Sequence, residues 1–212
     1  MGGIELRGSA VPRLAEDRPP AEPSSRDQKD RYDRILRAAA RHGAEKGLER
    51  VQMLDVARDA GVAIATLYRY FPSKTHLFTA LMRAQVERLG GLAVEPVPGQ
   101  TPEDAIAGLL LRAGQELLRT PLLAHAMMQS NNATVAQTPG AGVTEVFTDL
   151  MLEVAGIEHP TARDLRMLRL LEQAWYGILI TALNRHITQA ELEDDTVLIC
   201  RLLLRECDRA EA

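Results

Sequence analysis

The sequence predicts an all-α fold of about nine helices. Apolar residues recur at intervals of three and four along most of the 212-residue chain, the spacing that places them on one face of a helix. No stretch alternates apolar and polar residues as a half-buried strand does. The predicted boundaries also suit helices, because Ser, Thr and Pro stand at their starts and Gly at several of their ends.

The chain begins with a segment that has no helical pattern. Residues 1–27 contain four prolines and several charges, so we expect a disordered N-terminal arm. A first helix is predicted over residues 30–47, with Ile35 and Leu36 on its apolar face. Gly47 is a plausible stop for this helix.

Two short helices follow, separated by the tetrapeptide AGVA. The first has Met53 and Val56 on one face and ends at Gly61, because glycine readily adopts the left-handed backbone of a tight turn. The second covers residues 64–70 and closes before Pro72, since proline disfavours helical geometry in the residue before it.

A longer fourth helix is predicted to begin at Lys74, with Ser73 as its N-cap. The same signals indicate five more helices, over residues 101–120, 121–133, 138–156, 161–187 and 188–207. We therefore expect three parts in the chain. These are the arm over residues 1–27, a three-helix module over residues 28–75 and a larger helical bundle over residues 76–209.

Charge is distributed unevenly along the chain, whose net charge is −4. Residues 26–88 carry thirteen basic and eight acidic side chains, whereas residues 89–212 carry nine and seventeen. A basic module on an acidic remainder suggests that the first part contacts a polyanion, although chance asymmetry would give the same count.

The two short helices match a helix-turn-helix, in which the second helix enters the major groove of DNA. On this helix Leu67 and Phe71 are predicted to face a small core together with Val62. Tyr68 and Tyr70 are predicted to be an outward pair that offers hydroxyl groups to phosphates. The other side chains expected to point outward are Ile64, Ala65, Thr66 and Arg69.

The small side chains of Ala63 and Ala65 would let the backbone of this helix approach the groove closely. Thr66 is then the best candidate for contact with a base edge, through its hydroxyl or its methyl group. Lys74 lies in the first turn of the fourth helix, where the helix dipole favours acidic residues instead. A phosphate bound at the exposed amides of that turn would account for a lysine there.

The segments DVARDAGVA and TLYRYFPSK resemble the N-terminal domain of the TetR family of bacterial transcriptional regulators. The resemblance covers residues 30–84 in the family's order of helices. It implies that Gly61 makes the turn and that the chain contacts operator DNA. Two capping positions depart from the family pattern, because Gln52 and Ala63 stand where threonine and serine are common. The residues expected at the DNA are Gln52, Ala63, Ile64, Ala65, Thr66, Tyr68, Arg69, Tyr70 and Lys74.

The resemblance also implies a C-terminal domain that binds a small-molecule effector and forms a homodimer. The apolar stretches WYGILITAL and VLICRLLL suit a helical dimer interface, although a buried monomeric helix would look the same. Flexible methionines and the only tryptophan favour an apolar pocket, although such residues also fill ordinary cores. The candidate pocket residues are Met127, Met128 and Trp175, with Asn131 and Gln173 as polar anchors.

Within the family, the DNA-binding third and the later segment TPLLAHAMM are similar to KstR-type repressors. That similarity implies a large apolar effector of the acyl-coenzyme A type. The expected function is a repressor that an effector releases from a palindromic operator.

Two other classes of function compete with this interpretation. An enzyme is disfavoured because the five histidines are scattered and no HExxH, GxSxG or glycine-rich phosphate motif occurs. We expect no metal and no cofactor. A helical dimer without DNA affinity would leave Tyr68 and Lys74 unexplained. No apolar run long enough for a membrane span and no signal-peptide pattern occurs, so we expect a cytoplasmic protein.

Overall fold

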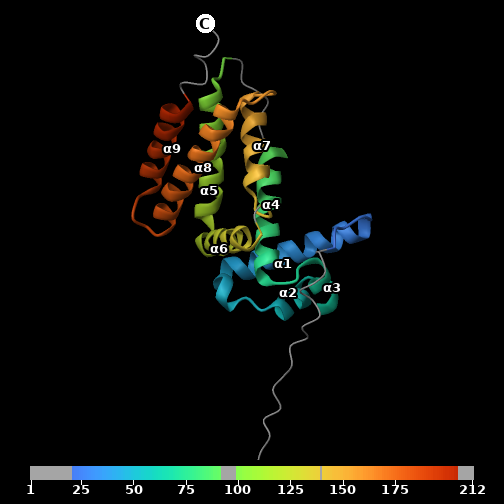
Figure 1. Ribbon diagram of the computed structural model, residues 1–212. Coiled ribbons are helices and arrows are strands. Elements are labelled where there is room, and N and C mark those ends of the chain that lie inside the picture. The colour runs from blue at the N-terminus through green and yellow to red at the C-terminus, as the bar shows by residue number, and fades with distance from the viewer. Residues whose placement is uncertain (1–20, 92–98, 139, 205–212) are drawn as a thin grey trace, which may run out of the picture.

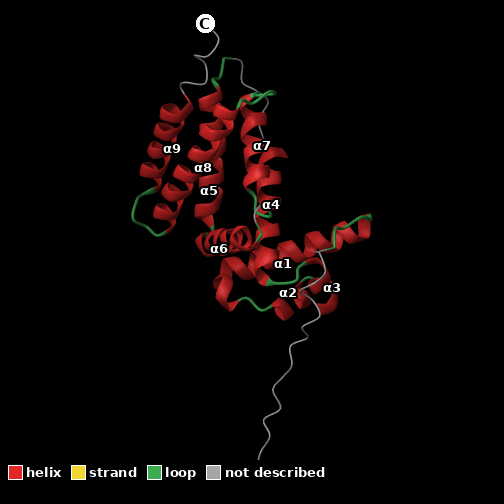
Figure 2. Cartoon of the chain, in the orientation of Figure 1, coloured by secondary structure: helices red, strands yellow, loops and turns green. Residues whose placement is uncertain are grey.

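The computed structural model describes residues 21–91, 99–138 and 140–204. Within these residues all regular structure is helical, which confirms the predicted fold class (Figure 2). The helices in chain order are α1 (Arg26–Arg50), α2 (Met53–Asp59), α3 (Ile64–Tyr70), α4 (Lys74–Gly91), α5 (Pro102–Arg119), α6 (Pro121–Gln137), α7 (Thr144–Ala155), α8 (Ala162–Leu183) and α9 (Gln189–Leu204).

Helix α1 begins about one turn earlier than predicted. The Ser25 hydroxyl accepts a hydrogen bond from the Gln28 amide at 3.3 Å, so Ser25 caps a helix that starts at Arg26. Gly47 breaks the helix, as expected, with a φ of 69° that glycine adopts without the steric penalty of a Cβ atom. A short last turn follows it.

The first four helices enclose one hydrophobic core, which lies in the lower part of Figure 1. We call it the N-terminal core. Ile35, Leu67, Leu77 and Phe78 are completely buried in it. Helices α1 and α4 approach closely here, because a Cβ atom on Gly43 would lie 2.6 Å from the ring of Phe78.

A second core lies among α5, α7, α8 and α9, which stand roughly parallel in the upper part of Figure 1. We call it the C-terminal core. Leu109, Met151, Leu171 and Leu192 are completely buried there, one from each of these helices. No described residue of α1, α2 or α3 belongs to this core.

Helix α6 crosses beneath this bundle and packs against both α1 and α4 (Figure 1). Met127 belongs to the N-terminal core and its neighbour Met128 to the C-terminal core. The buried hydroxyls of Thr79 in α4 and Thr134 in α6 lie 2.9 Å apart. Helix α6 is thus one of the elements through which the two cores meet.

Candidate nucleic-acid interface and ligand cavity

Helices α2 and α3 form the predicted helix-turn-helix at the lower end of the molecule in Figure 1. Gly61 turns the chain between them with a φ of 65°. The Val62 amide then donates to the carbonyl oxygen of Ala57 at 3.0 Å, which fixes the turn against the end of α2. This arrangement presents the outer face of α3 to the solvent.

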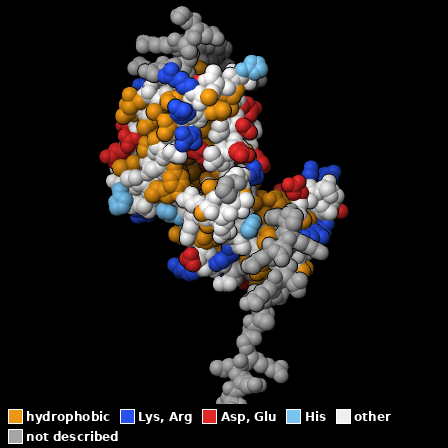
Figure 3. All heavy atoms as spheres, viewed as in Figure 1, with side chains coloured by type: hydrophobic (Ala, Val, Ile, Leu, Met, Phe, Trp, Pro, Cys, Tyr) orange, Lys and Arg blue, Asp and Glu red, His pale blue; other side chains and the backbone are white. Residues whose placement is uncertain are grey.

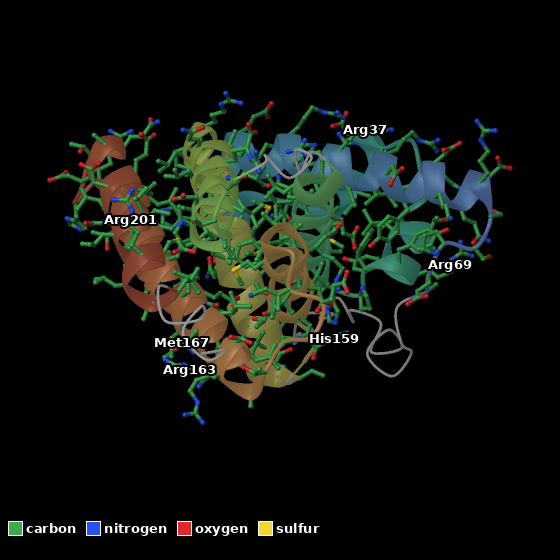
Figure 4. All side chains as sticks on the ribbon, turned by 90° about the horizontal axis from the view of Figure 1, so that it is seen from above. Arg37, Arg69, His159, Arg163, Met167 and Arg201 are labelled. Atoms are coloured by element: carbon green, nitrogen blue, oxygen red, sulfur yellow. The ribbon has the colours of Figure 1, made fainter. Side chains whose placement is uncertain are left out.

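Several residues predicted at the DNA lie on that outer face. Ala63, Ala65 and Arg69 are exposed, Tyr68 is 40% exposed, and Thr66 is half-buried. Small side chains at the start of the helix and a tyrosine and an arginine near its end form a surface that can enter a groove and donate hydrogen bonds. Figure 4 shows Arg69 near α3, on the side of the molecule opposite Arg163 of α8 and Arg201 of α9.

Tyr70 does not point outward, and that part of the sequence prediction is wrong. Its ring is 2% exposed and meets the ring of Tyr32 edge-on at a centroid distance of 5.7 Å. Ile64 is half-buried and also packs against the N-terminal core. The reason is helical spacing, because Ile64, Leu67 and Tyr70 follow one another at intervals of three and so share a face.

The buried Tyr70 nevertheless acts on the exposed part of α3. Its hydroxyl accepts a hydrogen bond from the Arg69 guanidinium at 3.2 Å, and the guanidinium carbon lies 5.0 Å from the centre of the Tyr70 ring. These contacts restrain Arg69 on the surface of the helix, where it would otherwise be a freely rotating side chain.

Both capping positions that depart from the family pattern lack a capping side chain. Gln52 precedes α2 and Ala63 precedes α3, and neither makes a side-chain capping hydrogen bond. Gln52 is exposed, so its amide faces solvent next to the helix-turn-helix. Ser73 does cap α4 as predicted, since its hydroxyl accepts from the His76 amide at 3.2 Å.

Lys74 has a structural reason for its position that the sequence did not reveal. Its ammonium group donates to the carbonyl oxygens of Leu48 at 3.2 Å and Glu49 at 3.3 Å, at the end of α1. The terminal carbonyls of a helix attract cations. Lys74 therefore caps the C-terminal end of α1, although it lies in the first turn of α4. The position of Lys74 thus has an explanation within the fold and does not by itself indicate a phosphate.

Part of the basic excess of the N-terminal helices is neutralised within the molecule. Arg41 pairs with Asp59 at 2.8 Å and Arg58 with Asp55 at 2.7 Å. The hydrogen bond from Arg41 lowers the pKa of the Asp59 carboxyl group below its usual value. Arg37 projects from α1 in Figure 4 and makes no ion pair with any described residue.

A cavity of about 610 Å³ lies among α4, α5, α6, α7 and α8. All five predicted pocket residues are on its wall, with Met127, Met128 and Asn131 coming from α6 and Gln173 and Trp175 from α8. No local pattern indicates the contributions of α4, α5 and α7, because the convergence of distant helices depends on packing. The apolar residues from those helices and their connections are Met82, Val86, Leu89, Ala113, Leu117, Val143 and Phe147.

Two asparagines on the cavity wall are already hydrogen-bonded within the protein. The side-chain oxygen of Asn131 accepts from the Val143 amide at 3.0 Å, and Asn132 donates to the Tyr176 hydroxyl at 2.6 Å. Trp175 stacks beside Phe147 at a centroid distance of 5.8 Å, and its buried indole nitrogen has no hydrogen-bond partner among the described residues. The cavity wall therefore suits a mostly apolar molecule.

Charged side chains also border the cavity. Glu172 accepts a hydrogen bond from the Thr144 hydroxyl at 3.2 Å, and its burial raises the pKa of the carboxyl group above the usual value. Arg88 and Arg169 are exposed and form no ion pair within the described part of the chain. Two unpaired guanidinium groups at the rim could hold an anionic group of a bound molecule.

Helices α8 and α9 both carry exposed leucines. These residues are Leu165 (43% exposed), Leu170 (38%), Leu198 (53%) and Leu202 (68%). Figure 3 shows hydrophobic and basic side chains together on this side of the molecule. Exposed leucines on two neighbouring helices are typical of a protein interface.

The described residues contain neither a candidate metal site nor a candidate membrane span. No three His, Cys, Asp or Glu side chains of the described ranges gather as metal ligands would. None of the helices described here is both long and apolar enough to span a membrane.

Comparison with known families gives two matches that together cover most of the chain. Residues 35–81 match the family described as bacterial regulatory proteins, tetR family. Residues 99–203 match the tetracyclin repressor-like C-terminal domain. The first match includes the helix-turn-helix and the second includes α5 to α8 and nearly all of α9.

Among curated proteins, the chain is similar to repressors named KstR. It is 32% identical over 192 residues to the HTH-type transcriptional repressor KstR of Rhodococcus jostii strain RHA1, covering 88% of each chain. It is 29% identical over 194 residues to KstR of Mycobacterium tuberculosis strain H37Rv, covering 90% of this chain and 88% of that one.

Solved structures with the same fold include a TetR transcriptional regulator from Rhodococcus sp. RHA1. That structure is 49% identical, superposes with a TM-score of 0.78 and is matched over 84% of this chain and 97% of its own. The TetR-family repressor FadR of Thermus thermophilus, solved in complex with lauroyl-CoA, is 20% identical with a TM-score of 0.53. It is matched over 85% of this chain and 97% of its own, and this second likeness concerns the fold alone.

Proposed function

Because the chain belongs to the TetR family of bacterial transcriptional regulators, we propose that it is a homodimeric repressor released from a palindromic operator by an apolar effector. Regulators of this family bind operator DNA and function as dimers, and release by a ligand is typical of them. One observation carries the proposal for this chain. Met127 lines the cavity and also packs in the N-terminal core, so a bound ligand touches the core that supports α3.

We assign the operator contacts to the outer face of α3 and to its flanks. Thr66, Tyr68 and Arg69 would meet base edges and nearby phosphates, while Ala63 and Ala65 allow a close approach. Tyr70 would act indirectly by restraining Arg69. Gln52 and Lys74 remain proposed phosphate contacts at the two ends of the motif, since Gln52 is exposed and a lysine that donates two hydrogen bonds retains a third N–H.

We propose that the homodimer forms through α8 and α9. Their exposed leucines would be buried in a two-fold interface, in which the same patch of each subunit meets its counterpart. A palindromic operator then follows from geometry, because two recognition helices about 34 Å apart read two half-sites.

We propose that the effector is a large apolar molecule of the acyl-CoA type. The apolar cavity wall would take its hydrocarbon part, and Arg88 and Arg169 would hold its anionic part at the rim. The resemblance to KstR-type repressors implies this class of ligand, and the Thermus thermophilus repressor of the same fold was solved with lauroyl-CoA. Occupancy would favour a spacing of the recognition helices that misfits the operator.

A gel mobility shift with the DNA that flanks the chain's own gene tests the operator part of this proposal. The affinity for DNA should fall steeply from the lower to the higher salt concentration, because binding to phosphates releases counterions and salt opposes that release. Lauroyl-CoA should raise the melting temperature and release the DNA, whereas a small polar drug should do neither. Absence of binding to any local DNA would contradict the proposal. A DNA-binding regulator works beside the chromosome, so we place the chain in the cytoplasm and propose no catalytic role.

A further inference from the structure

The chain that leads into α7 is held tightly against α6. We call residues 140–143 the α7 lead-in. The side-chain oxygen of Asn131 in α6 accepts a hydrogen bond from the Val143 amide at 3.0 Å. A Cβ atom on Gly142 would meet Val135 and would lie 2.9 Å from the Asn131 oxygen. The α7 lead-in therefore has no space to move toward α6.

The same α7 lead-in is also bound to α4. The Arg83 guanidinium donates a hydrogen bond of 2.7 Å to the carbonyl oxygen of Gly142, in a partly buried position. Charge-assisted hydrogen bonds of this length are among the stronger polar contacts in proteins. Arg83 lies between Leu81, which is buried in the N-terminal core, and Val86, which is buried in the C-terminal core.

The α7 lead-in borders the cavity, whereas Arg83 does not. Asn131, Val135 and Val143 all line the cavity wall. A ligand that fills the cavity would therefore press on the α7 lead-in without touching Arg83. Any displacement of Gly142 would pull directly on α4 through the Arg83 guanidinium.

Helix α4 in turn carries the helix-turn-helix. Leu77 and Phe78 are completely buried in the N-terminal core, and Lys74 holds the end of α1. Close-packed cores move as units because their side chains interlock. We propose that Arg83 is the positioning residue that converts ligand pressure on the α7 lead-in into movement of α4. This inference rests on the proposed function of the cavity.

A second route from the cavity to α4 competes with this one. Met82, Gln85 and Val86 of α4 line the cavity themselves, so a ligand could push α4 directly. The two routes differ in one respect. Only the route through the α7 lead-in requires Arg83.

Gly142→Ala drives the route without a ligand, because the new Cβ must move away from Val135 and Asn131. We expect this variant to bind the wild-type operator fragment at least tenfold more weakly. Arg83→Met alone should bind as the wild type does, and the double variant should recover to within about threefold of it. Val135→Ala in the Gly142→Ala background should restore part of the binding, since it removes one of the two atoms that the new Cβ meets too closely.

Hydrogen exchange over residues 74–91 gives a second measurement that needs no DNA. Gly142→Ala should speed exchange in α4, and Arg83→Met should cancel that effect. The inference is overturned if Gly142→Ala leaves both operator binding and α4 exchange unchanged, or changes them equally with and without Arg83. If Gly142→Ala does not fold, Asn131→Ala releases the Val143 amide and serves in its place. A wild-type protein that binds no DNA would contradict the proposed function, while the exchange measurement would still decide the role of Arg83.

Discussion

The ammonium group of Lys74 lies 3.2 Å from the carbonyl oxygen of Leu48, so the first turn of α4 closes the end of α1. The contact joins two helices that are separated in the chain by the whole helix-turn-helix. It stabilises the packing of α1 and α4, which share a core with α3. It also gives Lys74 a role that can be separated from DNA binding by measurement.

Replacement of Lys74 by Met keeps the apolar stem and removes the ammonium group. We expect the free energy of unfolding to fall by about 0.5–1.5 kcal/mol, because the terminal carbonyls of α1 lose their donor. Chemical denaturation measures this loss. If Lys74 also contacts a phosphate, the slope of log affinity against log salt should fall by about one unit. An unchanged stability would contradict the structural role.

Tyr68→Ala should weaken operator binding without affecting folding. The side chain is 40% exposed, so its loss leaves the N-terminal core intact. A lost contact at the DNA surface costs about 1–3 kcal/mol, which a mobility-shift titration resolves. The melting temperature is the control, and a decrease in it would show that the substitution acts through folding instead.

Tyr70 should behave in the opposite way. Tyr70→Ala empties a buried aromatic site and should lower the free energy of unfolding by about 3–5 kcal/mol. Tyr70→Phe keeps the ring and removes only the acceptor for Arg69, so stability should change by about 1 kcal/mol or less. A mild effect of the alanine variant would contradict the buried position of the ring.

The hydroxyl pair of Thr79 and Thr134 should show strong coupling in a double-mutant cycle. Thr79→Val leaves the buried Thr134 hydroxyl without its partner, which costs about 1–3 kcal/mol. The double Val variant removes both polar groups and should be closer to the wild type in denaturant unfolding. Additive losses would show that the two hydroxyls do not depend on each other.

Glu172 should make stability depend on pH. Burial raises its pKa in the folded protein above the ordinary value of 4.5, so the folded state holds the proton more tightly than the unfolded state does. The contribution of Glu172 to the free energy of unfolding is therefore highest at low pH and declines as pH rises from 4.5 through the raised value. Glu172→Gln should melt at a higher temperature than the wild type at pH 7, and the difference should vanish below pH 4.5. A lower melting temperature at pH 7 would contradict this.

Leu202→Glu should disrupt the proposed dimer. Leu202 is 68% exposed on α9, and a two-fold interface would bury the new charge twice. Light scattering after gel filtration should then give the mass of a monomer, and operator affinity should fall with it. Leu122→Glu on α6 is the matched control, because this leucine is 49% exposed and lies outside α8 and α9.

The sequence determined the fold class, the positions of most helices and the helix-turn-helix, because these depend on local spacing and on caps. Gly61, Pro72 and Ser73 mark the boundaries of α3 and α4 without any information about packing. Methionines, amides and a tryptophan on the later helices were also sufficient to indicate five residues that line one cavity.

The tertiary structure decided which way side chains face and what they contact. Tyr70 packs against Tyr32 of α1, and Lys74 caps a helix that ends 24 residues before it. The contact of Arg83 with Gly142 likewise joins residues 59 positions apart. Local patterns depend on neighbours three or four residues away, whereas these contacts arise only when distant helices pack together.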